Sequence, residues 1–447
     1  MISNFNRMQI RKGVTEASRA SARGWPRLVG RQWIMAFMLL ATFSASAQEA
    51  LQNSLAGEAA AGARTQQMQS TDYTFKDGDF QMLVLPSMGF EWNDNINLSK
   101  TNTLDDYILK PAVGITASYP LSQRNLLYLD INVGYDRYLL HHDLSTFDLN
   151  SASGTGLSFD IGIKDVTLNL HDWMSYVQDS AQNATVANTA SYGTFQNTAG
   201  IAATWDLNQV TLSAGYDHQN VIATSSAFDE INHASEMFFA RAAFLVHPKV
   251  TLGVEASAAF TTYEQTILNN NDAYTAGTYV EFRPSTALTI TARGGYSIYQ
   301  FQNTSTTNVT SDQNSWYASV NIAHQPRESI SYALEAGRET QLGTTSDLVQ
   351  DWYVRPNVTW KVINGLDINT SFFYEHGNEG VGSQNVPGNS NGNDTYDWYG
   401  GELTAQHPLS SRFTLGLDYR LTFRSSSSPD DGYTQNLVGL QLTYHPK

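Results

Sequence analysis

Apolar and polar side chains alternate, residue by residue, along most of this chain between Phe80 and Tyr444. In one of the clearest segments, one set of alternate positions is wholly apolar: Phe413, Leu415, Leu417, Tyr419, Leu421 and Phe423. A period of two places alternate residues on opposite faces of a β-strand. Because strands average about 5–6 residues, alternation over eleven residues favours a membrane β-barrel over a soluble β-sandwich.

Aromatic residues bracket some of these segments at a spacing that fits a bilayer. Phe195 and Trp205 lie ten residues apart on one face of a predicted strand, and so do Phe413 and Phe423. At roughly 3.3 Å per residue and a tilt near 40°, ten residues rise by about 25 Å, which is the height of the apolar band between the aromatic girdles of an outer-membrane barrel.

The pattern predicts an all-β fold, a transmembrane antiparallel up-and-down β-barrel of about eighteen strands. Sixteen strands is an open alternative, because segments 149–163, 166–177 and 234–246 alternate weakly, and an even number is expected of a bacterial single-chain barrel. The predicted strands are 80–93, 106–120, 125–138, 149–163, 166–177, 195–205, 209–218, 234–246, 250–262, 272–283, 287–299, 315–323, 329–338, 352–361, 366–376, 397–406, 413–424 and 435–445.

The predicted connections alternate between two kinds. One kind is short and often entered through proline, as at 120–124 and 247–249, because proline fixes φ and ends a strand. The other kind is long and rich in Asn, Ser, Thr and Gly; residues 377–395 are the extreme case and a candidate for a constriction folded into the barrel. Short turns on one rim and long loops on the other are typical of the periplasmic and outer sides of an outer-membrane barrel.

The end of the chain repeats one of these short turns. The last residues, His445-Pro446-Lys447, form the same tripeptide as 247–249. The final strand therefore stops where a periplasmic turn would begin. Together with the even strand count, this predicts that both termini lie on the periplasmic side.

Three prolines fall inside predicted strands, at Pro86, Pro111 and Pro356. Proline has no N–H for the sheet ladder, and a closed barrel has no edge strand to accommodate the missing hydrogen bond. All three lie on the predicted lipid face. We expect each of them to mark a β-bulge.

The N-terminal region predicts export. Seven basic residues between Arg7 and Arg31 precede the apolar stretch 33–43, and Ala45-Ser46-Ala47 fits a signal-peptidase site. We therefore predict a signal peptide at 1–47, a flexible periplasmic N-terminal extension at 48–79 and an outer-membrane β-barrel at 80–447. An uncleaved anchor is the alternative for the first segment. No later segment has 18 consecutive apolar residues, as a transmembrane helix would require.

Composition and charge narrow the function classes. Of the 447 residues, 41% are hydrophobic and 15% are charged, and none is cysteine. A disulfide scaffold, a thiolate metal site and a lipidated cysteine are therefore excluded. Cleavage after Ala47 would remove seven of the 26 basic and one of the 42 acidic residues, which leaves a net charge of −22. Nucleic acid is then a poor partner, since phosphate binding needs clustered Lys and Arg.

The opening strand carries a family resemblance. Leu85-Pro86-Ser87-Met88-Gly89-Phe90, followed by Trp92-Asn93-Asp94-Asn95-Ile96, resembles the N-terminal signature of β-barrel porins whose genes lie beside exopolysaccharide genes in diderm bacteria. The resemblance covers roughly residues 80–447. It implies a barrel in the cell outer membrane with a transport role, and it brings no catalytic residues. The final strand, ending near Tyr444, also resembles the aromatic signal read by the barrel assembly machinery, although three residues follow.

Charged residues fall on the predicted inward face of the strands. An Arg or Lys facing lipid at the midplane costs roughly 2–4 kcal/mol, so their near absence from the outward positions predicts lipid outside and water inside. The candidate pore-lining residues are Lys110, Asp130, Asp160, Arg241, Glu255, Glu281, Arg293, Glu335, Arg355, Asp367, Glu402, Asp418 and Arg420. An excess of acidic over basic inward residues predicts a mild preference for cations; mutual ion pairing that only keeps the lumen hydrated is the alternative.

Catalytic, metal and cofactor sites are not predicted. His141-His142-Asp143 follows a strand as a polar loop, without a nucleophile motif or a second His cluster nearby, and His171-Asp172 is similarly isolated. The sequence thus favours a porin-like passive channel for small hydrophilic solutes or saccharides, with outer-membrane lipid and the assembly machinery as further partners. The alternative is a non-conducting barrel that scaffolds or anchors polysaccharide export or surface adhesion; an enzyme is the least favoured class.

Overall fold

The structure is a computed structural model and describes residues 73–150, 156–178, 183–305, 309–363, 365–381 and 394–446. The predicted signal peptide and residues 48–72 of the predicted extension lie outside the described residues. Within the described ranges, no helix is long and apolar enough to cross a membrane.

Twenty strand segments form one antiparallel sheet. They are β1 (Phe75–Asp77), β2 (Phe80–Asn93), β3 (Asp106–Pro120), β4 (Asn125–Tyr138), β5 (Thr146–Asn150), β6 (Leu157–Ile163), β7 (Val166–Val177), β8 (Thr194–Asp206), β9 (Val210–Ala223), β10 (His233–His247), β11 (Val250–Tyr263), β12 (Asn271–Ser285), β13 (Leu288–Phe301), β14 (Gln313–Arg327), β15 (Ile330–Leu342), β16 (Leu348–Ile363), β17 (Leu366–Val381), β18 (Thr395–Pro408), β19 (Phe413–Ser426) and β20 (Tyr433–Tyr444). Two short 3₁₀ helices lie in loops of the described ranges, η1 (His142–Leu144) and η3 (Ser226–Ile231).

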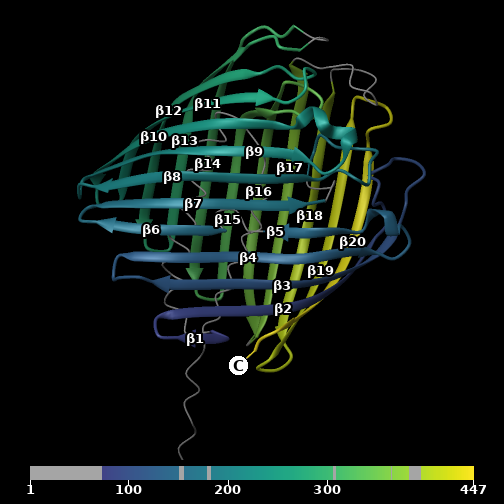
Figure 1. Ribbon diagram of the computed structural model, residues 1–447, viewed down its shortest axis with the longest axis horizontal. Helices are drawn as coiled ribbons and strands as arrows, with labels where there is room; N and C mark the ends of the chain where they lie inside the picture. The colour runs from purple at the N-terminus through teal and green to yellow at the C-terminus, as the bar shows by residue number, and fades with distance from the viewer. Residues whose placement is uncertain are drawn as a thin grey trace, which may run out of the picture. The chain divides into compact units, whose positions relative to one another are not determined.

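The sheet closes on itself, because β2 pairs with β20 from Ser87 opposite Thr443 to Asn93 opposite Leu437. Figure 1 shows the strands wrapping around a closed wall, with β2 and β20 adjacent. β5 and β6 share one position between β4 and β7, and β1 only adds a short hairpin to β2. The wall therefore has eighteen strands, which confirms the predicted number and removes the alternative of sixteen.

One predicted strand is interrupted. The segment predicted at 149–163 is β5 followed by β6, with residues 151–155 outside the described ranges. Asn150 lies opposite Asn132 and Leu157 opposite Leu129 of β4, so the registers of β5 and β6 against β4 differ by four residues. Because four is an even number, β5 and β6 keep the same faces inward and outward.

The two faces of the wall differ as the alternation predicts. On β10, Met237 and Phe239 point inward and are 0% and 6% exposed, whereas Phe238 between them points outward and is 45% exposed. Trp205 and Phe413, both predicted to belong to an aromatic girdle, are exposed on the outer face. The outer surface is thus apolar along most of each strand, and exposed charged side chains such as Arg137 and Glu236 lie toward the long-loop ends.

The connections also follow the prediction. Those after β3, β6, β8, β10, β12, β14, β16 and β18 span at most four residues, and those between them span at least five. The short and long connections therefore lie on opposite rims of the wall. Which rim faces the periplasm remains a prediction.

The prediction of a β-bulge at each in-strand proline is wrong. Pro86 lies opposite Val113 and Pro356 opposite Leu334 in ladders of unbroken register, and the β3–β4 register is the same before and after Pro111. Instead, pairing is locally absent on one side: at Pro111 toward β4, at Pro356 toward β17, and at Pro86 toward β20, where the ladder ends at Ser87 opposite Thr443. A wall strand that keeps one complete ladder tolerates the lost N–H without an inserted residue.

Part of the predicted flexible extension is ordered. Phe75 lies opposite Met82, and Asp77 opposite Phe80, so that β1 and β2 form a tight hairpin. Gly78 adopts a φ of 58°, which the hairpin turn requires and glycine adopts readily. The two-residue loop Gly78-Asp79, with glycine at its first position, is a hairpin signal that the expectation of a loose segment overlooked.

Candidate functional site

Two arginines share one buried carboxylate on the inner wall of β10–β13. Arg293 Nη1 lies 2.7 Å from Glu255 Oε2, and Arg241 Nε lies 3.9 Å from the same oxygen. Tyr317 donates its hydroxyl to Glu255 Oε1 at 3.0 Å. Both guanidinium groups also lie over the ring of Tyr279, at 4.9 and 5.0 Å. The Glu255 side chain is 0% exposed, so this carboxylate is enclosed by its partners and does not face open lumen.

Glycines on neighbouring strands make room for the tyrosine rings. A Cβ added at Gly253 would overlap the ring of Tyr279, and one added at Gly277 would overlap the hydroxyl of Tyr317. The rings therefore lie flat across a wall that has no side chain beneath them. This arrangement holds Tyr279 under the arginines and Tyr317 against Glu255.

A second cluster repeats this arrangement on β15–β18. Arg355 Nη2 lies 3.5 Å from Glu375 Oε2, and its guanidinium lies 4.3 Å above the ring of Tyr353. Tyr396 donates to Glu375 Oε1 at 2.9 Å, and Tyr353 donates to Glu335 at 3.5 Å. Glu375 is 1% exposed. We call the two clusters together, from Arg241 to Glu375, the arginine–tyrosine arc.

A different arrangement occurs on β2–β4. Lys110 Nζ lies 3.1 Å from Glu91 and 3.2 Å from Asp136, and the lysine side chain is 35% exposed. Both carboxylates are 15% exposed. We call these three residues the lysine site. Because about a third of its side chain is exposed on the inner face, the charge of Lys110 reaches the lumen.

Three more predicted residues gather on β18 and β19. Glu402 lies directly opposite Arg420, and Asp418 is two residues from Arg420 on the same inward face. All three are half-buried. The structure thus brings nine of the thirteen predicted pore-lining residues into clusters with other charged groups: Lys110, Arg241, Glu255, Arg293, Glu335, Arg355, Glu402, Asp418 and Arg420.

The other four lie apart from these clusters. Asp130 accepts from the hydroxyl of Tyr128 at 3.1 Å, and Asp160 accepts from Asn169 at 2.6 Å. Glu281 pairs with Arg283 at 2.8 Å near a short connection. Asp367 lies at the start of β17, opposite Lys361. Glu281 and Asp367 are therefore close to the rim of short turns.

His171 is not isolated, contrary to the expectation from sequence. Its Nε2 lies 2.8 Å from Asp217 Oδ1 and its Nδ1 lies 2.8 Å from Asn169 Oδ1. The imidazole stacks on Trp173 at 4.2 Å. His171 and Asp217 are both buried on the inner wall. Sequence reasoning missed the pair because Asp217 lies two strands away, although all these residues share the inward positions of their strands.

The loop after β7 folds into the mouth of the barrel, which sequence analysis did not predict. Ala184, Val186 and Tyr192 are buried in one apolar cluster with Tyr396 and Trp398 of the wall. The wall residues lie on β18, far from the loop in sequence. Burial raises the pKa of Tyr192 to about 12. The described residues 183–193 therefore cross the lumen at the long-loop rim. The predicted constriction 377–395 lies mostly outside the described residues.

Arg424 anchors this loop to the wall. Its Nε donates to the carbonyl of Ala184 at 2.7 Å, and its Nη2 lies 2.8 Å from Asp394 Oδ2. The side chain is 2% exposed and lies 5.0 Å from the ring of Tyr396. Thr185 and Thr344 add a hydroxyl contact at 2.7 Å. One buried arginine thus joins the loop to β18 and β19.

A second loop, 343–347, also turns inward. Asp347 accepts from the backbone and side chain of Asn269 at 2.8 and 2.9 Å and from Thr310 at 2.5 Å. Burial raises the pKa of Asp347, although these hydrogen bonds act in the opposite direction. Leu348, which follows the loop, packs on the inner faces of β10–β13. The two loops, 183–193 and 343–347, are far apart in the sequence, and both narrow the mouth of the barrel.

Chemistry-bearing groups are sparse elsewhere. Among the residues that the structure describes, no group of three or more His, Asp or Glu side chains has the arrangement of a metal site. His141 contacts Asp106 at 2.9 Å and His142 contacts the carbonyl of Tyr138 at 2.8 Å. Asp106 also accepts backbone N–H groups from residues 139–141. These histidines therefore belong to a capped loop.

Comparisons with known proteins give no family. No family model matches the sequence, and no curated protein matches it. Similar solved structures include OccK2 (OpdF) of Pseudomonas aeruginosa in complex with glucuronate, with 11% identity over 82% of this chain and 98% of that chain and a TM-score of 0.46. A BenF-like porin from Pseudomonas fluorescens Pf-5 has 10% identity over 82% and 99%, with a TM-score of 0.47. OccD3 (OpdP) of P. aeruginosa has 12% identity over 85% and 93%, with a TM-score of 0.44.

Proposed function

We propose that this chain is a passive, porin-like channel for small hydrophilic solutes or saccharides in the outer membrane of a diderm bacterium. The observation that carries the proposal is a closed wall of eighteen strands with apolar side chains outside and ionised side chains inside. A barrel of this size encloses an aqueous lumen unless it is filled. Charges inside such a wall are stable only if water or a counter-charge reaches them.

The inward loops set the size limit of the proposed channel. Residues 183–193 and 343–347 occupy part of the mouth, and the first is anchored by Arg424. Passage is then through the part of the lumen that these loops leave open. This geometry supports a channel for small solutes rather than for folded protein or long polymer.

The proposed lining consists of the thirteen inward charged residues already named. In the ion pairs of Lys110 with Glu91 and Asp136, the lysine side chain is more exposed than either carboxylate. A mild preference for cations, predicted from the acidic excess, is part of the proposal. So is a link to exopolysaccharide loci, which rests on the resemblance of residues 85–96 alone, and so is insertion by the barrel assembly machinery.

Single-channel recording tests the proposal. Refolded protein in a planar bilayer is expected to give discrete conductance steps in KCl, and reconstituted liposomes are expected to swell in solutions of small saccharides. Arg424→Ala should raise the conductance, because it releases Ala184 and Asp394. Arg283→Ala is a matched control, since Arg283 is 62% exposed and lies near a short turn. Correctly folded protein without any conductance would contradict the channel and would favour the scaffold alternative.

A further inference from the structure

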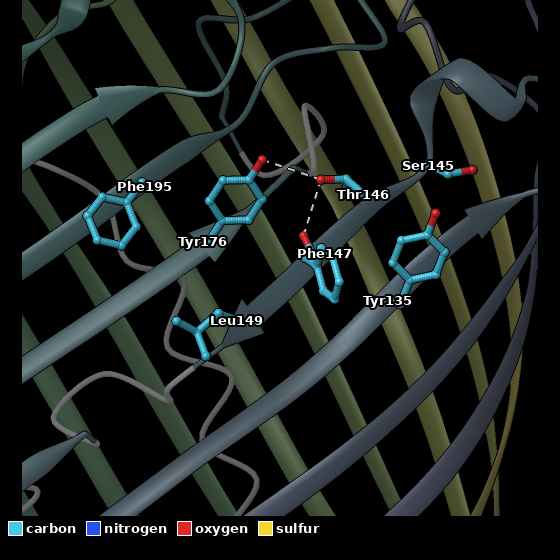
Figure 2. A pocket seen from close by; sticks show the side chains of 7 residues that line it. All are labelled: Tyr135, Ser145, Thr146, Phe147, Leu149, Tyr176 and Phe195. Carbon is cyan, nitrogen blue, oxygen red and sulfur yellow. Dashed lines mark hydrogen bonds between the residues drawn. The ribbon is translucent and has the colours of Figure 1, made fainter.

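A hollow that the proposed channel does not use lies on the outer face of the described wall. It has a volume of about 600 Å³ and is lined by Tyr135, Phe147, Leu149, Tyr176 and Phe195, with Ser145 and Thr146 at one end. Figure 2 shows these side chains on the near wall, with the strands of the opposite wall behind them. Phe147 is 67% exposed, on the same face as the exposed Val133 and Leu157. The hollow therefore opens outward.

The strand interruption creates this hollow. Tyr135 lies opposite Phe147, and Leu149 opposite Tyr176, so aromatic and aliphatic side chains from β4, β5 and β7 meet in one row. β5 pairs with β7 at only Leu149 and Asn150, because β7 ends at Val177. Among the described residues β5 and β7 share no further ladder, and the hollow lies beside this end of β7.

The surroundings of the hollow indicate a hydrocarbon occupant. On the neighbouring strands, Val113, Val133 and Ile222 are exposed on the same face and are apolar. The hollow is thus continuous with the apolar belt of the wall, which faces lipid. An aromatic floor in this belt provides dispersion contacts for a chain that lies along it.

The loop end of the hollow indicates a polar, anionic headgroup. Thr146 Oγ1 donates to the hydroxyl of Tyr176 at 3.4 Å, and Ser145 Oγ accepts from the backbone of Tyr138 at 3.1 Å. Arg137, exposed and on the same face as Tyr135, lies two residues nearer the loops. Within the described parts of the chain, no ion pair of Arg137 is present. An apolar hollow that ends at hydroxyl groups and an arginine without an ion pair fits an amphiphile with a hydrocarbon chain and an anionic headgroup.

We propose that this hollow binds one acyl chain of an anionic bilayer lipid, whose phosphate lies at Arg137. The chain lies along Phe147, Leu149 and Phe195, and the headgroup lies at the rim near Ser145. The guanidinium can donate two charge-assisted hydrogen bonds to one phosphate. In a zwitterionic lipid the cationic group of the headgroup partly neutralises that phosphate, so an anionic lipid should bind more tightly. The site would fix one lipid at the interrupted strand.

Lipid quenching at a single label tests the proposal, and the absence of native cysteine makes the label specific. Val133→Cys, next to Leu149, carries a fluorophore at the hollow. Val320→Cys on β14 is the matched control, because Val133 and Val320 are 38% and 40% exposed on the outer face. Each protein is reconstituted in phosphatidylcholine with a minor fraction of phosphatidylglycerol or phosphatidylcholine that has brominated chains.

At position 133 we expect brominated phosphatidylglycerol to bind with about fivefold preference over brominated phosphatidylcholine, as one arginine near a headgroup provides. The two lipids should quench equally at position 320. Arg137→Gln should abolish the preference, and Arg137→Lys should restore part of it. Leu149→Trp, which fills the hollow, should reduce quenching by both lipids at 133. Heat-modified gel mobility and unchanged conductance show that each variant is folded.

Three outcomes would overturn the proposal. Equal quenching at 133 and 320 by both lipids would mean that only ordinary surrounding lipid is present. A preference that survives Arg137→Gln would remove the headgroup site. Brominated fatty acid that quenches position 133 as strongly as phosphatidylglycerol at the same mole fraction would assign the hollow to free amphiphiles instead of bilayer lipid.

Discussion

The arginine–tyrosine arc and the lysine site are built from the same kinds of charge but present them differently. In the arc, Glu255 is 0% exposed and lies between two arginines and a tyrosine hydroxyl. In the lysine site, Lys110 is 35% exposed between two partly exposed carboxylates. Burial decides the consequence. An enclosed ion pair mainly holds the wall together, whereas an exposed one contributes to the field in the lumen.

The largest difference should appear when one carboxylate is removed from each region. Glu255→Gln leaves Arg241 and Arg293 without their shared partner, which is expected to cost about 3–5 kcal/mol of unfolding free energy. Glu91→Gln leaves Lys110 with Asp136 and with water, and should cost about 1 kcal/mol or less. Denaturant unfolding in detergent micelles measures both. Similar losses in the two variants would contradict the distinction.

Replacing glycine by alanine tests whether the tyrosine rings of the arginine–tyrosine arc need the space that glycine leaves. A methyl group at Gly277 would overlap the Tyr317 hydroxyl and displace it from Glu255, which should cost about 1–3 kcal/mol. Gly114 is also on the inner face, but its nearest neighbours would lie 3.8 Å from an added Cβ. Gly114→Ala is therefore expected to be neutral or slightly stabilising. The same unfolding assay checks the pair; a neutral Gly277→Ala would show that the ring position does not matter.

Ion selectivity should depend more on the lysine site than on the arginine–tyrosine arc, the reverse of the order expected for stability. Lys110→Gln leaves Glu91 and Asp136 facing the lumen, and is expected to raise the cation-over-anion permeability ratio about two- to threefold. Arg293→Gln should change it less, because Arg241 still lies over Glu255. The reversal potential in a KCl gradient measures the ratio. A larger shift for Arg293→Gln would mean that the arc, not the lysine site, faces the ion path.

Two loop carboxylates extend the same contrast to pH, with the smallest expected effect. Burial raises the pKa of Asp394, but hydrogen bonds from Ser426 and Ser427 and the charge of Arg424 outweigh it and leave that pKa below 3.8. The stability that Asp394 contributes is therefore present above pH 3.8 and is lost as the pH falls through its lower folded pKa. Burial leaves the pKa of Asp347 above 3.8. Its contribution has the opposite sign: the protonated form is favoured at low pH, and stability is lost as the pH rises from 3.8 through the raised pKa.

Asparagine variants separate these two signs. Asp394→Asn should be less stable than the native protein by about 1 kcal/mol at neutral pH and should match it in acid. Asp347→Asn should be equal or slightly more stable at neutral pH and should lose that advantage in acid. Unfolding at a series of pH values checks both. Parallel pH profiles for the two variants would refute the assignment.

Strand boundaries were largely predictable because burial has a period of two in a thin wall. Four predicted segments, 80–93, 106–120, 125–138 and 166–177, agree with β2, β3, β4 and β7. The prediction was wrong where local pattern and pairing disagree. At 149–163 weak alternation predicted one strand, whereas β5 and β6 pair with β4 in registers that differ by four residues. At Pro111 and Pro356 the missing N–H requires only a local gap, and the sequence alone cannot distinguish that from a bulge.

The sequence by itself determined the class of fold, the parity of each strand and thus which charges face inward, because these depend on neighbours two residues apart. Only the tertiary structure decided which inward charges meet, as Arg241 and Arg293 do at Glu255, and which loop enters the mouth. Those contacts join residues that are far apart along the chain. They depend on the register in which β2 and β20 close the barrel and on the space left by glycines such as Gly277. No local pattern in the sequence predicts either of these.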